Sequence, residues 1–322
     1  MNSTEILITA PLLPSVMDAL ESAFTTHRLW EQPDRHAFLD SVGPHIRGAA
    51  TSTYHGRIDD AFLAQLPALE IVASFGVGYD NVDAAAAAAR GVVVTNTPGV
   101  LDEEVADLTI GLLLATVRQI PQAERFLREG QWLKGAFPLS PTLRGRRIGI
   151  VGLGNIGKAV ARRLEGFDVA VAYHGRSKQE DVLFDYHPTL VGLTEASDVL
   201  IAIVPGGAGT RNLIDAEVLA ALGPQGILIN VARGSVVDEA ALIAALQSGT
   251  ILSAGLDVYA DEPRVPQALL DLPNLVLLPH IGSGSVQTRA AMGQLLVDNL
   301  VQWFAEGRPV TSVPETAHLF AG

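Results

Sequence analysis

The stretch RRIGIVGLGNIGKAVARRLEGF (residues 146–167) decides how the chain is expected to fold. RIGIV has the character of a buried strand, and KAVARRLEGF has the pattern of a helix. Between them, Gly152, Gly154 and Gly157 keep the spacing G-x-G-x-x-G. In a strand–turn–helix setting these glycines allow a tight turn, close approach of a pyrophosphate and close packing of helix on strand. We therefore predict a dinucleotide site, the alternative being a tight turn that binds nothing.

The segment after the next strand, DVAVAYHGRSK (residues 168–178), indicates which dinucleotide is bound. NAD-binding units place a carboxylate about 20 residues after the glycines, where it accepts hydrogen bonds from the ribose. This segment holds no acid, and the first acids come later, at Glu180 and Asp181. Arg176 can pair with a 2′-phosphate and Ser177 can hydrogen-bond it. The sequence therefore predicts NADP(H) rather than NAD(H), unless Arg176 is only a solvated surface charge.

Outward from the glycine turn, short apolar runs alternate with helical patterns over most of the chain, as in parallel α/β sheets. One series begins at Arg146 and continues through DVLIAIVP, GILINVA, ILSAGLDVY and LVLLPHIG. An earlier series has predicted strands within residues 5–13, 69–80 and 91–99, and predicted helices over 84–90 and 101–119. A last helix is predicted over 286–306. We expect two α/β units, with the helix over 101–119 as their connector.

Composition excludes several classes of function. The chain has 322 residues, a net charge of −13 and no cysteine. The acidic balance argues against nucleic acid as a partner and against an anionic membrane surface. Without cysteine there are no disulfides, thiolate metal sites or cysteine nucleophiles, and no histidine motif for a metal is present, so we predict no metal. No apolar run reaches the roughly 20 residues of a membrane span, and we expect a cytoplasmic protein.

Three polar residues stand at the ends of late apolar runs. Arg233 follows ILINVA, Glu262 closes AGLDVYADE and His280 closes LVLLPH. Open α/β sheets build their sites at such strand ends. A fixed cation, a carboxylate and an imidazole together suffice to bind a 2-keto acid and to deliver a proton to its carbonyl group. Spacing alone makes this a hypothesis, since a single strand-end charge is more often structural.

At this point the chain resembles the D-isomer-specific 2-hydroxyacid dehydrogenases. The resemblance runs from about Leu69 to Asn299 through six motifs in order: FGVGYDNVD, TNTPGVLDEEVADL, VGLGNIG, NVARGSVVDE, GLDVYADEP and PHIGSGS. It implies two doubly wound parallel-sheet domains of the Rossmann or flavodoxin-like type, with a cleft between them. Residues 1–99 and 286–322 would form the substrate-binding domain, and residues 100–285 the NADP-binding Rossmann domain.

The same resemblance implies roles for individual residues. Arg233 would bind the substrate carboxylate and polarise the keto oxygen. His280 would be the general acid in reduction, and Glu262 would favour its protonated form. Backbone N–H groups of Val77 and Gly78 would hold the carboxylate as well. Ile156 would contact the pyrophosphate of the cofactor, and Asp257 would face its nicotinamide carboxamide. The full set of expected cofactor-binding residues is Gly152, Gly154, Asn155, Ile156, Gly157, His174, Arg176, Ser177, Pro205 and Asp257.

Within the family, the stretches YHGRSK and VPGGAGTRNLID are most similar to the NADPH-dependent glyoxylate/hydroxypyruvate reductases. We therefore expect NADPH-dependent reduction of a small 2-keto acid to the 2-hydroxy acid by hydride transfer. The alternatives are a reductase for a larger acid such as hydroxyphenylpyruvate, and an NAD(P)-sensing, co-repressor-like binding module. Tyr54 and His55 depart from the residues expected at the substrate entrance. A homodimer is expected on family grounds, with the segment from Trp132 to Leu143 as a candidate contact.

Overall fold

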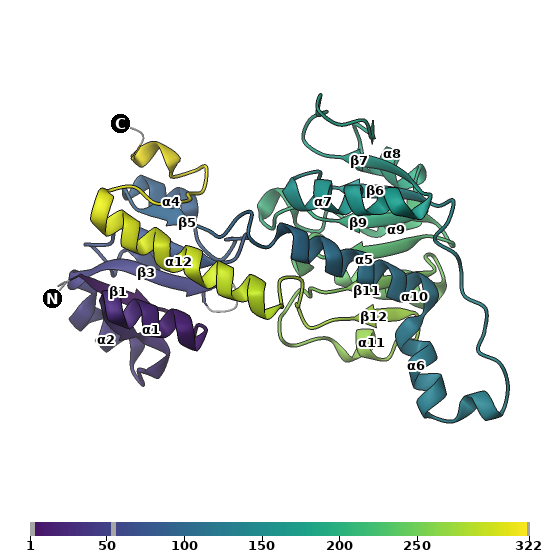
Figure 1. Cartoon of the computed structure of the whole chain (residues 1–322), viewed down its shortest axis with the longest axis horizontal. Helices are drawn as coiled ribbons and strands as arrows, with labels where there is room; N and C mark the ends of the chain where they lie inside the picture. The colour runs from purple at the N-terminus through teal and green to yellow at the C-terminus, as the bar shows by residue number, and fades with distance from the viewer. Residues whose placement is uncertain (1–3, 53–55, 321–322) are drawn as a thin grey trace. The chain divides into compact units, whose positions relative to one another are not determined.

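The computed structural model describes residues 4–52 and 56–320, and the chain divides into two compact units (Figure 1). Unit 1 comprises Met1–Leu101 and Ser285–Gly322, and unit 2 comprises Asp102–Gly284. Each unit is built on a parallel sheet of its own. The prediction of two parallel α/β sheets is confirmed.

Unit 1 has a five-stranded sheet in the order β2-β1-β3-β4-β5, in which every pair is parallel. Its strands are β1 (Glu5–Ile8), β2 (Thr25–Arg28), β3 (Ile46–Ser52), β4 (Ile71–Phe75) and β5 (Val93–Thr95). Its helices are α1 (Pro14–Ala23), α2 (Arg35–Val42), α3 (Asp60–Leu63), α4 (Ala84–Ala89) and α12 (Val286–Glu306). The predicted last helix over 286–306 is confirmed.

Helices cover both faces of this sheet, because its strands are apolar on both sides. Helix α12 packs so closely that a Cβ at Gly48 of β3 would lie 3.3 Å from Leu300. Helix α1 lies beside α12, where a Cβ at Gly293 would lie 2.3 Å from Val16. On the opposite face, buried residues of α2, α3 and α4 pack against the sheet, among them Leu39, Leu63, Ala87, Val72 and Val94.

Unit 2 has a seven-stranded parallel sheet in the order β12-β11-β10-β9-β6-β7-β8. Its strands are β6 (Arg147–Val151), β7 (Ala170–His174), β8 (Asp185–Tyr186), β9 (Val199–Ala202), β10 (Ile227–Asn230), β11 (Ser253–Leu256) and β12 (Leu275–Leu277). Its helices are α5 (Asp102–Arg118), α6 (Ile120–Arg128), α7 (Asn155–Leu164), α8 (Leu190–Glu195), α9 (Ala216–Leu222), α10 (Glu239–Ser248) and α11 (Gln267–Leu270).

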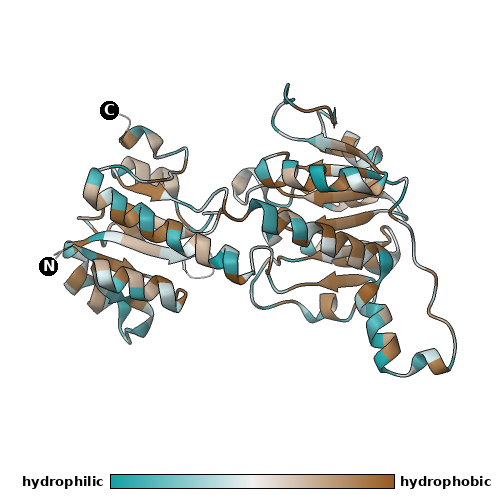
Figure 2. Ribbon diagram, in the orientation of Figure 1, coloured by the Kyte–Doolittle hydropathy of each residue, from teal (hydrophilic) through white to brown (hydrophobic). Residues whose placement is uncertain are grey.

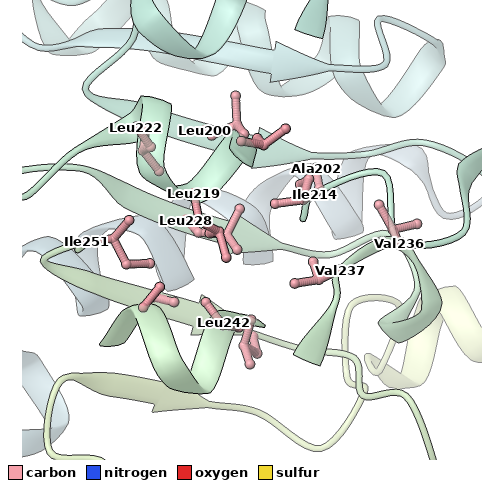
Figure 3. Packing of buried hydrophobic residues seen from close by; sticks show 14 of the residues in the cluster. Leu200, Ala202, Ile214, Leu219, Leu222, Leu228, Val236, Val237, Leu242 and Ile251 are labelled. Atoms are coloured by element: carbon pink, nitrogen blue, oxygen red, sulfur yellow. The ribbon is translucent and has the colours of Figure 1, made fainter. Parts of the chain in front are cut away.

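The strands of the larger sheet are mostly hydrophobic (Figure 2), and each face has its own core. Figure 3 shows the face covered by α9 and α10, where Leu219 and Leu242 pack over Leu228 of β10. The other face is covered by α5 and α7. Each fully buried leucine contributes about 1.5–3 kcal/mol to folding relative to an exposed one, so the two cores hold the strand ends in fixed positions.

Helix α6 was not predicted, and it begins an excursion from unit 2. Gln119 has a left-handed backbone, and the chain then continues as α6, in which no residue is buried. Figure 1 shows α6 and the segment after it projecting away from the rest of the unit. Trp132, Leu133 and Leu139 there are 69%, 95% and 100% exposed.

Two expected elements differ from the structure. The strand predicted within residues 5–13 ends at Ile8, because Pro11 has no N–H group for the sheet. The strand predicted within 91–99 is limited to Val93–Thr95. Within the described residues, no helix is long and apolar enough to cross a membrane.

Candidate active site

The candidate residues of unit 2 lie along one edge of its sheet. All seven strands are parallel, so their carboxyl ends meet at that edge. The strand order reverses between β6 and β9, and open α/β sheets bind ligands at such a switch point. Each candidate follows its own strand: the glycine turn follows β6, His174 and Arg176 lie at β7, Pro205 follows β9, Arg233 follows β10, Asp257 follows β11 and His280 follows β12.

The glycine turn has the close contacts that its spacing predicts. A Cβ at Gly152 would lie 2.7 Å from the carbonyl oxygen of Ile203, and a Cβ at Gly157 would lie 2.3 Å from that of Gly152. Gly154 caps α7, and a Cβ there would meet nothing within 4 Å. Gly152 and Gly157 are therefore required by packing, whereas Gly154 leaves space above the start of α7, as close approach of a ligand requires.

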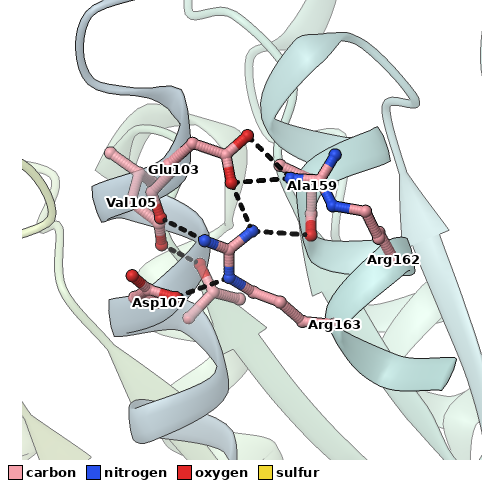
Figure 4. A network of polar contacts seen from close by, with 7 residues as sticks. Glu103, Val105, Asp107, Ala159, Arg162 and Arg163 are labelled. Carbon is pink, nitrogen blue, oxygen red and sulfur yellow. Dashed lines mark hydrogen bonds and ion pairs between the residues drawn. The ribbon is translucent and has the colours of Figure 1, made fainter. Parts of the chain in front are cut away.

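Ion pairs fix α7, whose first turn carries Asn155 and Ile156, to α5 (Figure 4). Arg162 Nη2 lies 2.6 Å from Glu103 Oε2, and Arg163 Nε lies 2.6 Å from Asp107 Oδ1. The hydrogen bonds from Arg162 and then Arg163 lower the pKa of the Glu103 carboxyl. These pairs join two helices on the same face of the sheet and so orient the N-terminus of α7.

The segment after β7 keeps its positive charge available. Arg176 and Ser177 are exposed, and no carboxylate of the described residues pairs with Arg176. The late acid Asp181 is instead engaged by Lys158 of α7, at 2.8 Å. The Nδ1 atom of His174 lies 2.9 Å from the carbonyl oxygen of His187. The turn therefore offers a guanidinium and a hydroxyl group to an anion.

Gln179 was missed by the sequence analysis, although it connects this segment to the glycine turn. Its backbone N–H donates to the hydroxyl of Tyr173 at 2.7 Å, and its side-chain Nε2 donates to the carbonyl oxygen of Leu153 at 2.7 Å. Hydrogen bonds from a side chain to distant backbone leave no motif in a sequence, so no signal could have found Gln179.

Arg233 stands on a turn that packs against the loop bearing Glu262. The side chain of Asn230, at the end of β10, accepts from Ala232 N–H at 3.0 Å and donates to the Arg233 carbonyl at 3.1 Å. A Cβ at Gly234 would lie 1.8 Å from the carbonyl carbon of Tyr259, so only glycine allows this approach. Asn230 was also missed, although an Asn at a strand end is a recognisable local turn former.

The structure brings His280 and Glu262 together. Nδ1 of His280 lies 2.6 Å from Oε2 of Glu262, and their side chains are 22% and 23% exposed. The other carboxylate oxygen accepts from the N–H of Tyr259 at 3.0 Å. Burial acts to raise the pKa of Glu262, but His280, Tyr259 N–H and the positive charge of Arg233 outweigh it and leave the pKa below its ordinary value. The carboxylate is thus held ionised beside the imidazole.

Asp257 holds the loop that carries His280. Its two carboxylate oxygens accept from the backbone N–H groups of Ile281 and Gly282, each at 2.8 Å. His280 itself has a left-handed backbone, with φ of 53°. Burial raises the pKa of Asp257, although the two N–H groups act against it. A contact of Asp257 with the cofactor stays a prediction, whereas its hold on the histidine loop was not foreseen.

In unit 1, Val77 and Gly78 come two and three residues after the end of β4, at the carboxyl edge of the five-stranded sheet. They lie in the loop between Phe75 and the start of α4. Tyr54 and His55, which depart from the expected pattern, lie outside the described residues.

Comparison with known proteins gives this arrangement a family. The profile of the D-isomer specific 2-hydroxyacid dehydrogenase NAD-binding domain matches residues 110–282. The chain is similar to the crystal structure of an NADPH-dependent glyoxylate/hydroxypyruvate reductase from Sinorhizobium meliloti in complex with NADP and malonate. The two share 55% identity, with 98% of each chain covered and a TM-score of 0.93.

Two plant enzymes are similar over nearly the same length. A glyoxylate/hydroxypyruvate reductase A of Arabidopsis thaliana is 42% identical over 313 residues, which is 97% of this chain and 100% of the relative. A hydroxyphenylpyruvate reductase of Plectranthus scutellarioides is 43% identical over 310 residues, which is 96% of this chain and 98% of the relative. The chain therefore belongs to the D-isomer-specific 2-hydroxyacid dehydrogenase family.

Proposed function

We propose that this protein reduces glyoxylate or hydroxypyruvate to the 2-hydroxy acid with NADPH. The observation that carries the proposal is the hydrogen bond of 2.6 Å between His280 and Glu262, at the sheet edge that also bears the glycine turn. The relatives named as glyoxylate/hydroxypyruvate reductases, one of them in complex with NADP, support the same activity.

Unit 2 would hold NADP(H), and its residues fit that cofactor. The space above Gly154 and the N-terminus of α7 suit a pyrophosphate. Arg176 and Ser177 suit a 2′-phosphate, because the nearby acid Asp181 is engaged by Lys158. When bound, the cofactor supplies the hydride. Further contacts are assigned to Gly152, Asn155, Ile156, Gly157, His174, Pro205 and, at the nicotinamide carboxamide, Asp257.

His280 would donate the proton to the keto oxygen. Because Nδ1 is engaged by Glu262, Nε2 is the ring nitrogen for this transfer. The ionised carboxylate of Glu262 stabilises the imidazolium and fixes the ring orientation. A general acid must carry a proton to donate, and a carboxylate beside the imidazole suits His280 to this role in reduction.

The substrate carboxylate would be bound by Arg233 and by the N–H groups of Val77 and Gly78. A guanidinium can pair with a carboxylate through two parallel hydrogen bonds, which also fixes the direction of the keto group. The turn from Asn230 to Gly234 fixes the backbone of Arg233, and so the point from which its side chain extends. We accordingly assign substrate binding to unit 1 and cofactor binding to unit 2.

We also propose a homodimer formed through the excursion after α5. Trp132, Leu133 and Leu139 are large apolar side chains that are mostly exposed, and exposed apolar surface favours association. Sedimentation or light scattering should give twice the chain mass. A monomer at micromolar concentration would contradict this assignment without affecting the activity.

The test of function is initial rates of NADPH and NADH oxidation with glyoxylate, hydroxypyruvate, pyruvate, 2-ketobutyrate, phenylpyruvate and hydroxyphenylpyruvate. Fast turnover of a two- or three-carbon acid with NADPH is expected. Preference for an aromatic acid would place the protein nearer the hydroxyphenylpyruvate reductase to which it is similar. NADPH binding with no turnover of any acid would favour a cofactor-sensing module instead.

A further inference from the structure

The last segment of the chain lies along the open edge of the sheet in unit 1. β5 is the outermost strand on that side, so its outer backbone groups need partners. Val313 N–H donates to the carbonyl of Val94 at 3.0 Å, and Val94 N–H donates to the hydroxyl of Thr316 at 3.1 Å. Glu315 also accepts from the hydroxyl of Tyr79 at 3.1 Å. The segment from 311 to 316 thus touches both the edge strand and the loop after β4.

Asn96 and Thr97, which follow β5, donate hydrogen bonds to carbonyl groups of the loop after β4. The backbone N–H of Thr97 donates to the carbonyl oxygen of Gly76 at 2.9 Å. The side-chain amide of Asn96 donates to the carbonyl oxygen of Val77 at 2.8 Å. Asn96 is 8% exposed and Thr97 is fully buried, so water does not compete with these bonds.

These two bonds fix two peptide planes. A trans peptide is planar, and its C=O and N–H groups point in opposite directions. The carbonyl of Gly76 shares a plane with Val77 N–H, and the carbonyl of Val77 shares a plane with Gly78 N–H. Because the two carbonyls point to residues 97 and 96, the N–H groups of Val77 and Gly78 both point away from those residues.

Asn96 is in turn held from behind by the end of the chain. The hydroxyl of Thr311 donates to the carbonyl of Asn96 at 2.8 Å. Asn299 of α12 is fully buried; its side chain accepts from Thr311 N–H at 2.8 Å and donates to Thr311 Oγ1 at 2.9 Å. The hydrogen bonds therefore run without a break from α12 through Thr311 and Asn96 to Val77.

We propose that Asn96, supported by Thr311 and Asn299, is a positioning residue that aims the N–H groups of Val77 and Gly78 at the substrate carboxylate. This rests on the proposed function, in which those two groups bind the carboxylate. Asn96 touches no substrate atom; it acts through the peptide planes. Selection for an acid over an uncharged carbonyl compound then depends on a hydrogen-bond chain that begins in α12.

The test is Asn96→Ala, which removes the amide but adds no charge beside the carboxylate. We expect the Kd of malonate for the enzyme–NADP complex and the KM of glyoxylate to rise about 10- to 100-fold, since hydrogen bonds to a charged group are lost or misdirected. The Kd of NADPH should stay within about twofold, because unit 2 is unchanged. Equal weakening of malonate and NADPH binding, or unchanged malonate binding, would overturn the proposal.

A matched pair of tail variants separates positioning from stability. Thr311→Val breaks the link to Asn96, whereas Thr316→Val breaks a bond to Val94, two residues earlier in β5. We expect both to lower the free energy of unfolding, and only Thr311→Val to raise the KM of glyoxylate, by about 3- to 10-fold. Equal KM values would overturn the proposal and leave the function standing. A wild-type protein with neither turnover nor malonate binding would refute the function and, with it, this role of Asn96.

Discussion

The carboxyl edges of the two sheets are built in different ways. In unit 2, polar side chains follow successive strands, and the proposed chemical groups are the side chains of His280, Glu262 and Arg233. In unit 1, the candidate groups at Val77 and Gly78 are backbone N–H groups, and the side chain of Asn96 hydrogen-bonds the backbone between them. A site made of side chains can therefore be identified from residue types, whereas a site made of backbone groups depends on hydrogen bonds between segments far apart in the sequence.

The largest effect is expected from His280→Gln, which removes the proposed proton donor of unit 2. Glutamine cannot act as a general acid, so kcat should fall about 10²–10⁴-fold while NADPH binding is retained. His27→Gln is a matched control, because His27 Nε2 also lies 2.7 Å from a carboxylate, that of Glu5, within the strands of unit 1. Steady-state kinetics on both variants would test the role of His280 as the general acid. A near-normal kcat in His280→Gln would refute that role.

Gly234→Ala tests whether the side chains of unit 2 also depend on backbone packing. The added Cβ would lie 1.8 Å from the Tyr259 carbonyl carbon, so the Arg233 turn must shift. We expect a loss of about 1–3 kcal/mol in the free energy of unfolding and of about 10- to 100-fold in kcat/KM. Gly166→Ala, where a Cβ would meet nothing within 4 Å, should change neither. Urea unfolding and kinetics that do not distinguish the two variants would contradict this.

Arg176→Asp sharpens the assignment of the cofactor. Replacing a cation by an anion at the predicted 2′-phosphate site should lower the ratio of kcat/KM for NADPH to that for NADH by at least about 10-fold. Arg144→Asp makes the same change of charge just before β6, at the opposite end of the strand from the glycine turn. If both variants shift the ratio equally, the effect is one of net charge and the phosphate is bound elsewhere.

The smallest expected effect is that of Tyr79→Phe in unit 1. Burial, together with the carboxylate of Glu315, raises the pKa of Tyr79 to about 12 from an ordinary value of 10.0. The folded state thus favours the neutral phenol, and its contribution is complete below pH 10 and is lost as the pH rises through about 12. The wild type should therefore lose stability between pH 10 and 12 more steeply than Tyr79→Phe does.

Unfolding at a series of alkaline pH values would measure this. At neutral pH the substitution should cost less than about 1 kcal/mol, because the hydrogen bond to Glu315 is exposed. Tyr186→Phe serves as the control, since that hydroxyl donates to the backbone carbonyl of Gly175 and not to a carboxylate. Parallel stability curves for the wild type and Tyr79→Phe would contradict the role of Glu315.

Much of unit 2 could be predicted because its chemistry is local in the sequence. The glycine spacing requires a turn whose packing the structure confirms at Gly152 and Gly157. The apolar runs before Arg233 and His280 identify strands, and a polar residue at each end is visible in a single line of sequence. The pairing of His280 with Glu262 followed from the family resemblance, and the separation of 2.6 Å agrees with it.

The support of the loop after β4 could not be predicted in this way. Asn96 is 19 residues from Val77, and Thr311 is 215 residues from Asn96. Asparagine and threonine are common turn residues, so neither type nor spacing distinguishes these from their neighbours. The hold of Asp257 on Ile281 and Gly282 was missed for the same reason.

The return of the chain to unit 1 has a consequence for the order in which the protein is made. Residues 102–284 are contiguous and form a unit with cores of its own, so they can fold while the ribosome still holds the rest. The five strands of unit 1 leave the ribosome first, yet α12 and Thr311 leave it last. Unit 2 is thus complete before the loop at Val77 receives its support. With the proposed roles of the two units, a nascent chain would acquire its affinity for dinucleotide before its affinity for acid.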